Sequence, residues 1–273
     1  MRQYVCASLP DRNGLLTVSG KDYRYMRQVL RLCTGDMLQV RFPDGTLQNT
    51  TVCKVDEGAR CIVLQVCAQT ETDGHLPQDV VPLDLWLFQF VARSAKMDSI
   101  VRQATECGVS TIVPVLGEFS QSGGGEKNWR GERLLRIIKE ARQQSGSATD
   151  TRVLDAVPLD KAIALWKEHC ADSVCESVER AEPCDTFSAV LYERTEDTLP
   201  LHTAIAGRKI RRAALAVGAE GGISPAEIDL LKDGGFVPVH FKTNILRCET
   251  AALYGIAALQ NAIAEQETWQ CKE

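Results

Sequence analysis

The chain has 273 residues, of which 44% are hydrophobic and 25% are charged, and its formal net charge is −5. These values are ordinary for a globular protein and exclude disordered, collagen-like and coiled-coil chains. There is no run of about 18 apolar residues, so we expect no transmembrane helix and no membrane partner. The first residues lack the apolar core of a secretory signal. The acidic balance does not indicate a nucleic-acid binder, although a local basic patch can bind nucleic acid within an acidic total.

The cysteine pattern argues against a zinc site and against a disulfide scaffold. Eleven cysteines are scattered along the chain, and no pair has the Cys-x-x-Cys spacing of a zinc site. An odd count in a chain of this length argues against a disulfide scaffold. We therefore expect no metal and mostly reduced cysteines that fill apolar positions in the cytoplasm.

The first seventy residues indicate a small β structure with one helix. Three short alternating runs are separated by Asp-Gly-type turns, which is typical of a meander or a small barrel. A helix is expected over 19–32, and it carries four basic residues. The predicted strands are 37–42, 46–55 and 60–67, and the basic residues are Lys21, Arg24, Arg27 and Arg31. We expect this domain to cover 1–72, followed by a polar linker over 73–82 that contains Gly74 and Pro77.

From residue 83 to 273 the pattern changes to alternating strands and helices. The run 83–91 is almost entirely apolar, as in a strand that is buried on both faces. The order predicts an α/β domain with a parallel sheet and helices on both faces. The further predicted strands are 111–116, 189–192, 213–218 and 236–241. One predicted helix begins near 94 and ends at Gly108, and another covers 129–145. The segment 168–185 is polar, and we assign it no function.

Ligands bind at the carboxyl ends of the strands in open α/β sheets, and two such corners stand out. The first corner, 216–227, runs from a strand through a glycine-rich turn into a helix. Ser224 is the expected N-cap, with Pro225 at the first helical position and Glu227 completing a capping box. The glycines would let a ligand approach closely, or they serve only a tight turn with nothing bound.

The second corner, 237–252, passes through a short polar loop into a long helix expected from about 249 to 266. Glu249 is favourable at a helix N-terminus, whereas Arg247 is not, which makes Arg247 a functional candidate. The alternative is that Arg247 pairs with Glu249 or Glu220 as a structural brace. The chain contains neither Gly-x-Gly-x-x-Gly nor a phosphate-binding loop, and it has no Gly-x-Ser-x-Gly elbow, which disfavours dinucleotide enzymes, P-loop ATPases and hydrolases.

Together the two corners resemble the last two sequence blocks of the 16S ribosomal RNA (uracil-N3)-methyltransferase family of the SPOUT superfamily. The family block Gly-Pro-Glu-Gly-Gly-Leu/Phe-Ser-x-x-Glu stands here as GAEGGISPAE (218–227). The block Ile-Leu-Arg-x-Glu-Thr-Ala is matched by ILRCETA (245–251). Weaker similarities lie at 96–109, at 140–145, and at 29–32 followed by Gly35-Asp36.

The resemblance implies an amino-terminal PUA-like β-barrel that helps to hold RNA. It also implies a carboxy-terminal α/β/α domain with a deep trefoil knot, which is a rare exception to general folding rules. The implied cofactor is S-adenosylmethionine, bound in the knot, and the implied assembly is a homodimer with sites at its interface. The implied reaction is methyl transfer to N3 of a uridine in 16S ribosomal RNA, with that RNA or the small ribosomal subunit as partner.

For this reaction we expect Arg247 to stabilise the negative charge that develops on the uracil carbonyls. Glu220 is expected to orient Arg247 or to help remove the proton. The residues expected to contact the methyl donor are Val217, Gly218, Gly221, Gly222, Phe241, Ile245, Leu246, Glu249 and Thr250. The residues expected to contact RNA are Lys21, Arg24, Arg27, Arg31, Arg93 and Lys96; a solvated helix face is the alternative for the first four.

The chain departs from the family pattern mainly where basic residues are usual, which reduces the positive charge available for RNA. Two alternative functions follow: a non-catalytic knotted RNA-binding or ribosome-assembly factor, and a SPOUT methyltransferase that acts on a different RNA site. The departures are Ala219 for proline, Phe119, Ser147 and Asn244 for arginine, and Phe241-Lys242 for Leu-Gly.

Overall fold

The computed structural model describes residues 3–67, 83–120, 131–172, 185–194 and 196–269. The chain divides into two compact units, one formed by Met1–Gln78 with Arg142–Ala148 and the other by Asp79–Ala141 with Thr149–Glu273. The predicted linker, 73–82, lies outside the described residues, and the predicted domain boundaries stay a prediction. No helix in the described part is long and apolar enough to cross a membrane.

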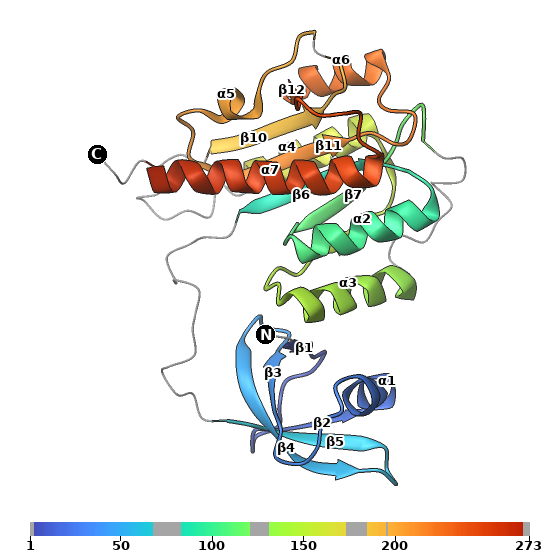
Figure 1. Cartoon of the computed structure of the whole chain (residues 1–273), viewed down its shortest axis with the longest axis vertical. Coiled ribbons are helices and arrows are strands. Elements are labelled where there is room, and N and C mark those ends of the chain that lie inside the picture. Colours follow the sequence, from blue (N-terminus) through green and yellow to red (C-terminus); the bar gives the residue numbers. More distant parts are fainter. Residues whose placement is uncertain (1–2, 68–82, 121–130, 173–184, 195, 270–273) are drawn as a thin grey trace. The chain divides into compact units, whose positions relative to one another are not determined.

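The first unit is a five-stranded sheet in the order β1-β3-β4-β5-β2, which curls into a half-barrel beside α1 (Figure 1). The antiparallel meander β3-β4-β5 confirms the three predicted strands. The predicted helix is present as α1, which continues into a π-helical turn, η1. The bounds are β1 (Gln3–Val5), β2 (Leu15–Ser19), α1 (Gly20–Arg24), η1 (Tyr25–Val29), β3 (Met37–Arg41), β4 (Leu47–Asp56) and β5 (Cys61–Val66).

Two strands of this unit, β1 and β2, were not predicted. Strand β1 has three residues and pairs in parallel with β3, while β2 pairs antiparallel with β5. Alternation within β2 buries Leu16 and Val18, which join Met26 and Ile62 in the core of the unit. Such short strands depend on partners far away in the sequence, and local pattern alone indicates them weakly.

The second unit is built on a parallel sheet in the order β12-β10-β11-β6-β7-β8, with β9 also paired to β7. Every pairing in this sheet is parallel, as predicted. The strands are β6 (Asp84–Phe90), β7 (Thr111–Leu116), β8 (Arg152–Val153), β9 (Val157–Pro158), β10 (Asp185–Leu191), β11 (Ile210–Val217) and β12 (Val237–Val239). The helices are α2 (Ser94–Glu106), α3 (Glu132–Ser145), α4 (Leu159–Asp172), α5 (Leu201–Ile205), α6 (Pro225–Asp233) and α7 (Cys248–Trp269).

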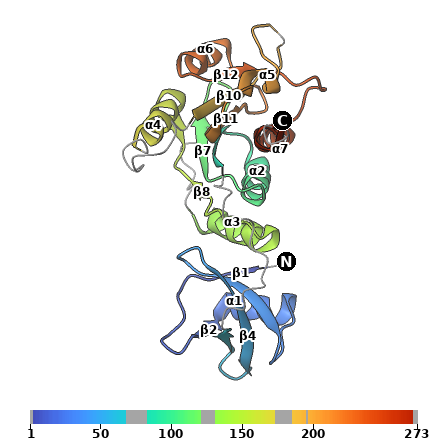
Figure 2. The same cartoon turned by 90° about the vertical axis from the view of Figure 1, so that its left-hand side faces the viewer.

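Helices cover both faces of this sheet, as predicted (Figure 2). Alternation along β6 separates two cores, because successive side chains of a strand point to opposite faces. Leu85 and Leu87 pack in the core shared with α2, α3 and α7, whereas Trp86 and Phe88 pack in the core shared with α4 and α6. In the polar segment 168–185, to which no function was assigned, residues 168–172 continue α4, and residues 173–184 lie outside the described part.

Helix α7 lies unusually close to the strands that it crosses. A Cβ atom at Gly255 would lie 2.6 Å from Leu191 Cδ1 and 3.0 Å from Leu215 Cδ2, so a larger residue has no room there. The helix follows β12, at the edge of the sheet, yet it packs against β11 and α2. The chain therefore returns across the sheet and brings the start of α7 toward the end of β6.

The start of α6 has the predicted capping box. Ser224 accepts a hydrogen bond from Glu227 N, and the Glu227 carboxylate accepts one from Ser224 N at 2.9 Å. The same carboxylate accepts Glu118 N at 2.7 Å, which fixes the loop after β7 against the helix. One buried carboxylate thus positions two of the loops at the carboxyl edge of the sheet.

We expect Ser224→Ala to lower the free energy of unfolding by about 1 kcal/mol, because a buried N-cap acceptor is lost. Chemical denaturation measures the change. Ser94→Ala is the control, since Ser94 is the first residue of α2 rather than its N-cap, and its hydroxyl accepts only a long contact of 3.5 Å from the exposed Arg133 Nη1. Equal stabilities of the two variants would show that the cap does not determine this helix start.

Candidate functional site

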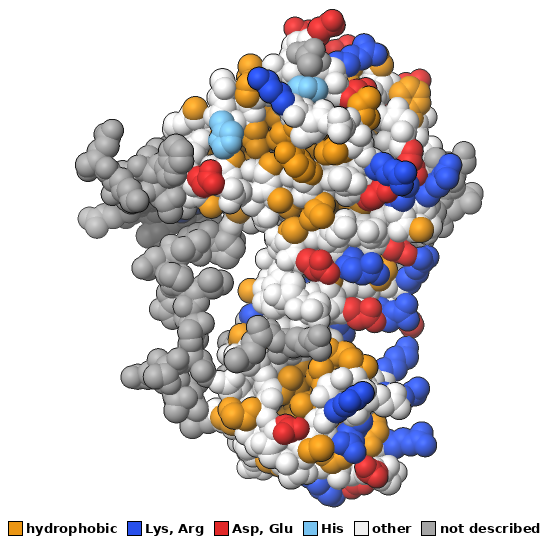
Figure 3. Space-filling view, viewed as in Figure 1, with side chains coloured by type: hydrophobic (Ala, Val, Ile, Leu, Met, Phe, Trp, Pro, Cys, Tyr) orange, Lys and Arg blue, Asp and Glu red, His pale blue; other side chains and the backbone are white. Residues whose placement is uncertain are grey.

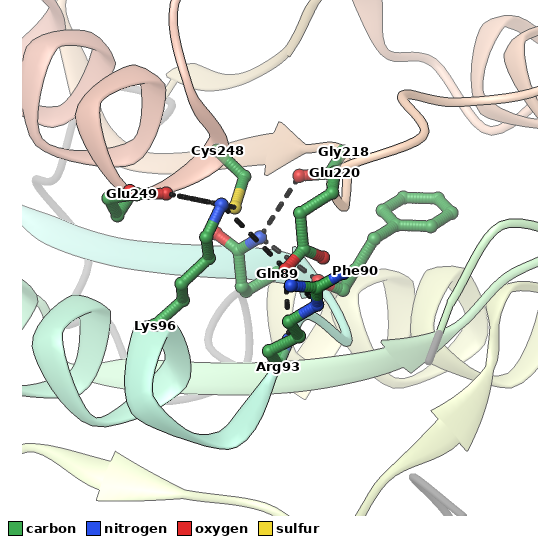
Figure 4. A network of polar contacts seen from close by, with 8 residues as sticks. All are labelled: Gln89, Phe90, Arg93, Lys96, Gly218, Glu220, Cys248 and Glu249. Carbon is green, nitrogen blue, oxygen red and sulfur yellow. Dashed lines mark hydrogen bonds and ion pairs between the residues drawn. The ribbon is translucent and has the colours of Figure 1, made fainter. Parts of the chain in front are cut away.

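Three segments meet at the carboxyl ends of β6, β11 and β12 (Figure 4). They are the loop after β6, the glycine-rich turn after β11 and the segment that leads into α7. Lys96 Nζ lies 3.7 Å from Glu220 Oε1 in the turn and 3.2 Å from Glu249 Oε2 at the start of α7. The two corners singled out in the sequence therefore lie together in the structure.

A fully buried glutamine joins the first two of these segments. Gln89 Nε2 donates hydrogen bonds to Phe90 O at 3.0 Å, Val217 O at 3.3 Å and Gly218 O at 3.2 Å. Its Oε1 atom is buried and has no hydrogen-bond partner among the described residues. Sequence reasoning missed Gln89; the available signal was one polar residue inside the apolar run 83–91.

The geometry of the turn itself accounts for its glycines. A Cβ at Gly218 would lie 2.9 Å from the carbonyl carbon of Gly222, and a Cβ at Gly221 would lie 2.8 Å from Phe119 Cβ. Gly222 has a φ of +79°, which favours glycine, and its N–H donates to Ala219 O at 3.0 Å. The turn is closed by its own backbone contacts and packs against the exposed Phe119.

The carboxylates at the two corners are held by basic groups from the β6–α2 segment. Glu220 Oε1 accepts Arg93 N at 3.2 Å and lies 3.9 Å from Arg93 Nε. Lys96 pairs with both Glu220 and Glu249, and its ammonium also lies 3.9 Å from Cys248 Sγ. Figure 4 shows the ammonium of Lys96 between the two carboxylates.

These contacts determine the protonation of the cluster. The hydrogen bond to Glu249 raises the pKa of Lys96 above its ordinary value. Burial opposes ionisation of Glu249, but its own backbone N–H, the Cys248 thiol and Lys96 together lower the pKa of its carboxyl. Burial, together with the hydrogen bond to Glu249, raises the pKa of Cys248 to about 11. These shifts favour a charged Lys96 ammonium, an ionised Glu249 carboxylate and a neutral Cys248 thiol at neutral pH.

Arg247 is exposed, and its side chain has no hydrogen bond or ion pair with any described residue. The alternative that Arg247 braces Glu249 or Glu220 is therefore not what the structure shows. Lys96 pairs with both glutamates instead. The guanidinium of Arg247 is left available to a ligand.

The other residues expected at the methyl donor differ in their surroundings. Val217 is buried at the end of β11, and Phe241 is half-buried with its ring 5.1 Å from that of Tyr254 in an edge-on contact. Leu246 is half-buried, Thr250 is exposed, and Ile245 is 89% exposed. The structure thus brings Val217, the glycines and Glu249 to one cluster and leaves Ile245 open to solvent.

The basic residues expected to contact RNA divide into three groups. Lys21, Arg24 and Arg31 are exposed in the first unit, where Figure 3 shows basic side chains over the region of α1. Arg27 is instead engaged within the unit, with Nη2 3.0 Å from Glu57 Oε1 and Nη1 2.7 Å from Leu32 O. In the second unit, Arg93 is exposed beside Glu220, whereas Lys96 is half-buried in the cluster.

Comparisons with known proteins agree with this architecture. A family profile described as an RNA methyltransferase domain matches residues 80–260. The ribosomal RNA small subunit methyltransferase E of Aquifex aeolicus is 32% identical over 77% of this chain and 80% of its own length. The protein of the same name from Bacillus subtilis is 24% identical over 89% of this chain and 88% of its own.

Among solved structures, a ribosomal RNA small subunit methyltransferase E from Neisseria gonorrhoeae bound to S-adenosyl methionine is similar in fold. It has a TM-score of 0.73 and 21% identity, and the match covers 96% of this chain and 97% of that one. The parallel sheet and the sequence matches therefore support the same family assignment. The chain belongs to the RNA methyltransferase family that includes the ribosomal RNA small subunit methyltransferase E proteins.

Proposed function

We propose that this protein transfers a methyl group from S-adenosylmethionine to N3 of a uridine in 16S ribosomal RNA. Membership of the family supports the reaction class, and the names of the relatives support the ribosomal substrate. One observation supports the assignment to a site: Lys96 joins the two corners at the carboxyl edge, and Arg247 has no side-chain partner among the described residues. The cytoplasm, where small ribosomal subunits are assembled, is the expected place of action.

The residues at the corners fit S-adenosylmethionine. The buried Gln89 Oε1 has no donor within the described ranges, and S-adenosylmethionine carries amino and hydroxyl groups that can donate. Ile245 and Leu246 offer apolar surface for an adenine ring. When bound, S-adenosylmethionine would supply an activated methyl group, so the protein has chiefly to place the nucleophile in line behind it.

The side chains supply the remaining chemistry. The N3 proton of uracil must leave before the lone pair can attack, and negative charge then spreads to the flanking carbonyl oxygens. The guanidinium of Arg247, which pairs with no residue in the described part of the chain, stabilises that charge. Glu220 is held by Arg93 N and Lys96 and makes no contact with Arg247, so its role in this proposal is to accept the proton.

Two finer features of the fold belong to this proposal. The half-barrel of the first unit acts as a PUA-like RNA-binding domain. The segment between β12 and α7 passes through a deep trefoil knot. The position of β12 at the edge of the sheet, with α7 packed on α2, supports this path.

A second copy of this chain is the proposed partner across α7. The helix carries apolar residues on both its buried and its exposed sides, and hydrophobic side chains gather around it in Figure 3. Tyr254 of this helix is 44% exposed. Sedimentation equilibrium tests the dimer, and a monomer at assay concentrations contradicts it.

Mapping of modified nucleosides tests the function as a whole. Deletion of the gene should remove one N3-methyluridine from 16S ribosomal RNA, and the purified protein should restore it with S-adenosylmethionine. Loss of a methyl group elsewhere would favour the alternative of a different RNA site. Donor-independent RNA binding without transfer would favour a non-catalytic assembly factor.

We expect Arg247→Ala to reduce turnover about 100- to 1000-fold while donor binding persists, because one charge-stabilising donor is lost. Single-turnover methyl transfer measures the rate, and calorimetry measures donor binding. Arg247→Lys, which keeps the charge but not the planar fork, is the comparison. Near-normal turnover in the alanine variant removes Arg247 from the mechanism.

We expect binding of 16S ribosomal RNA to weaken steeply as salt rises, because each phosphate contact releases counterions. Combined replacement of Lys21, Arg24 and Arg31 by glutamine should reduce the slope of log K against log salt by about 2. Filter binding at several salt concentrations measures the slope. Arg27→Gln should change it little because Arg27 is paired with Glu57. Equal slopes in all variants would favour a solvated helix face.

A further inference from the structure

We propose that Lys96 is a positioning residue, which joins the two corners of the methyl-donor site through one ammonium group. The inference rests on the proposed function and deepens it. It differs from the expectation that Lys96 contacts RNA phosphate. Its basis is the placement of one side chain between carboxylates from two distant segments.

The geometry places Lys96 as a bridge. It lies in the first turn of α2, with Nζ 3.2 Å from Glu249 Oε2 and 3.7 Å from Glu220 Oε1. Its side chain is 27% exposed, whereas that of Arg93 in the preceding loop is 75% exposed. Figure 4 shows the side chain of Lys96 pointing from α2 into the cluster.

The charges require such a bridge. Glu220 and Glu249 are both partly buried, at 22% and 23% side-chain exposure, and like charges at close range repel. An ammonium is a compact charge with three donors, so it can serve both carboxylates at once. Removal of the cation leaves Glu249 without its ion pair and Glu220 with Arg93 alone, and it frees the glycine turn from the start of α7.

Lys96 also determines what Arg247 can do. Arg247 precedes Glu249 by two residues, and it has no ion pair in the described part of the chain. With Lys96 in place, both carboxylates are already paired. Without Lys96, Arg247 becomes a nearby cation that the carboxylates can capture, and its guanidinium is withdrawn from the substrate. Lys96 therefore acts through Glu220, Glu249 and Arg247 rather than by contact with RNA.

A phosphate contact is disfavoured by the same geometry. A phosphate that approached Lys96 would meet the carboxylates of Glu220 and Glu249, and it would have to displace one of them. The hydrogen bond to Glu249 and the second carboxylate keep the ammonium charged and occupied. The neighbouring Arg93, which is mostly exposed, is better placed for a phosphate.

The test compares Lys96→Met, Lys96→Arg and the matched control Arg102→Met, which removes an exposed cation from the same helix. We expect the Lys96→Met variant to lose roughly tenfold or more in S-adenosylmethionine affinity and in kcat. The Arg variant should recover most of both. The slope of RNA binding against salt should stay at its wild-type value. Circular dichroism and thermal unfolding report whether each variant folds.

The pH profile gives a readout that a purely structural role would not move. Lys96 helps to hold the pKa of Glu249 below its usual range, so the carboxylate stays ionised as the pH falls. Without Lys96 that pKa rises, and the acid side of the rate profile should move to higher pH. The Arg102→Met profile should match that of the wild type.

Alkylation of Cys248 tests the bridge without the methyl donor. Cys248 is 5% exposed beside the cluster, and separation of the corners would expose its thiol. Peptide mapping should therefore show faster alkylation of Cys248 in Lys96→Met than in the wild type, Lys96→Arg or Arg102→Met. The alkylation experiment tests the role of Lys96 even if the wild type transfers no methyl group. That outcome would contradict only the proposed function.

Two results would overturn the inference. A fall of about 0.7 to 0.9 in the salt slope with unchanged donor affinity and kcat would identify Lys96 as a phosphate contact. Unchanged donor affinity, pH profile and Cys248 alkylation in the Met variant would show that the two corners hold together without it.

Discussion

The structure of the site depends on the parallel pairing of β6 with β11. Because both strands run in the same direction, their carboxyl ends open onto the same edge of the sheet, and the loops that follow them meet. Gln89 makes this junction specific, since one buried carboxamide donates to carbonyls of both strand ends. Buried polar groups need partners, so this glutamine fixes the two ends relative to each other. The start of α7 then joins the same edge, and the polar cluster forms where the three segments meet.

The sequence predicted what depends on local pattern. The capping box at Ser224 and Glu227 is a contact between near neighbours, and it is present as expected. The parallel sheet followed from alternating strand and helix periods. The strands β1 and β2 were missed because they are short and paired with distant segments. Within the apolar run of β6, the pattern indicated burial but gave no reason to single out Gln89.

The partners of charged side chains could not be predicted in the same way. The sequence placed Arg247, Glu249 and Glu220 at the two corners, and it allowed Arg247 to be a brace or a functional group. Ion pairing depends on the tertiary structure. In the structure Lys96, which is more than 120 residues away from either glutamate in the chain, pairs with both of them. Likewise the sequence does not distinguish Arg27 from the other cations of its helix, because its partner Glu57 lies on a different segment. The sequence allowed the glycines of the turn to face a ligand or only to form the turn. The close approach of Gly218 to Gly222 and of Gly221 to Phe119 shows that the turn itself requires glycine.

The central claim is that the glycine turn and the start of α7 hold the methyl donor between them. Titration calorimetry of S-adenosylmethionine into the wild type and into Gly218→Val tests it most directly. Side-chain atoms at position 218 would collide with the backbone of Gly222, so the valine variant distorts the turn. We predict saturable binding to the wild type and loss of binding in the valine variant, with the secondary structure of both unchanged. A wild type that does not bind the donor, or a folded valine variant that binds it equally well, would contradict the account.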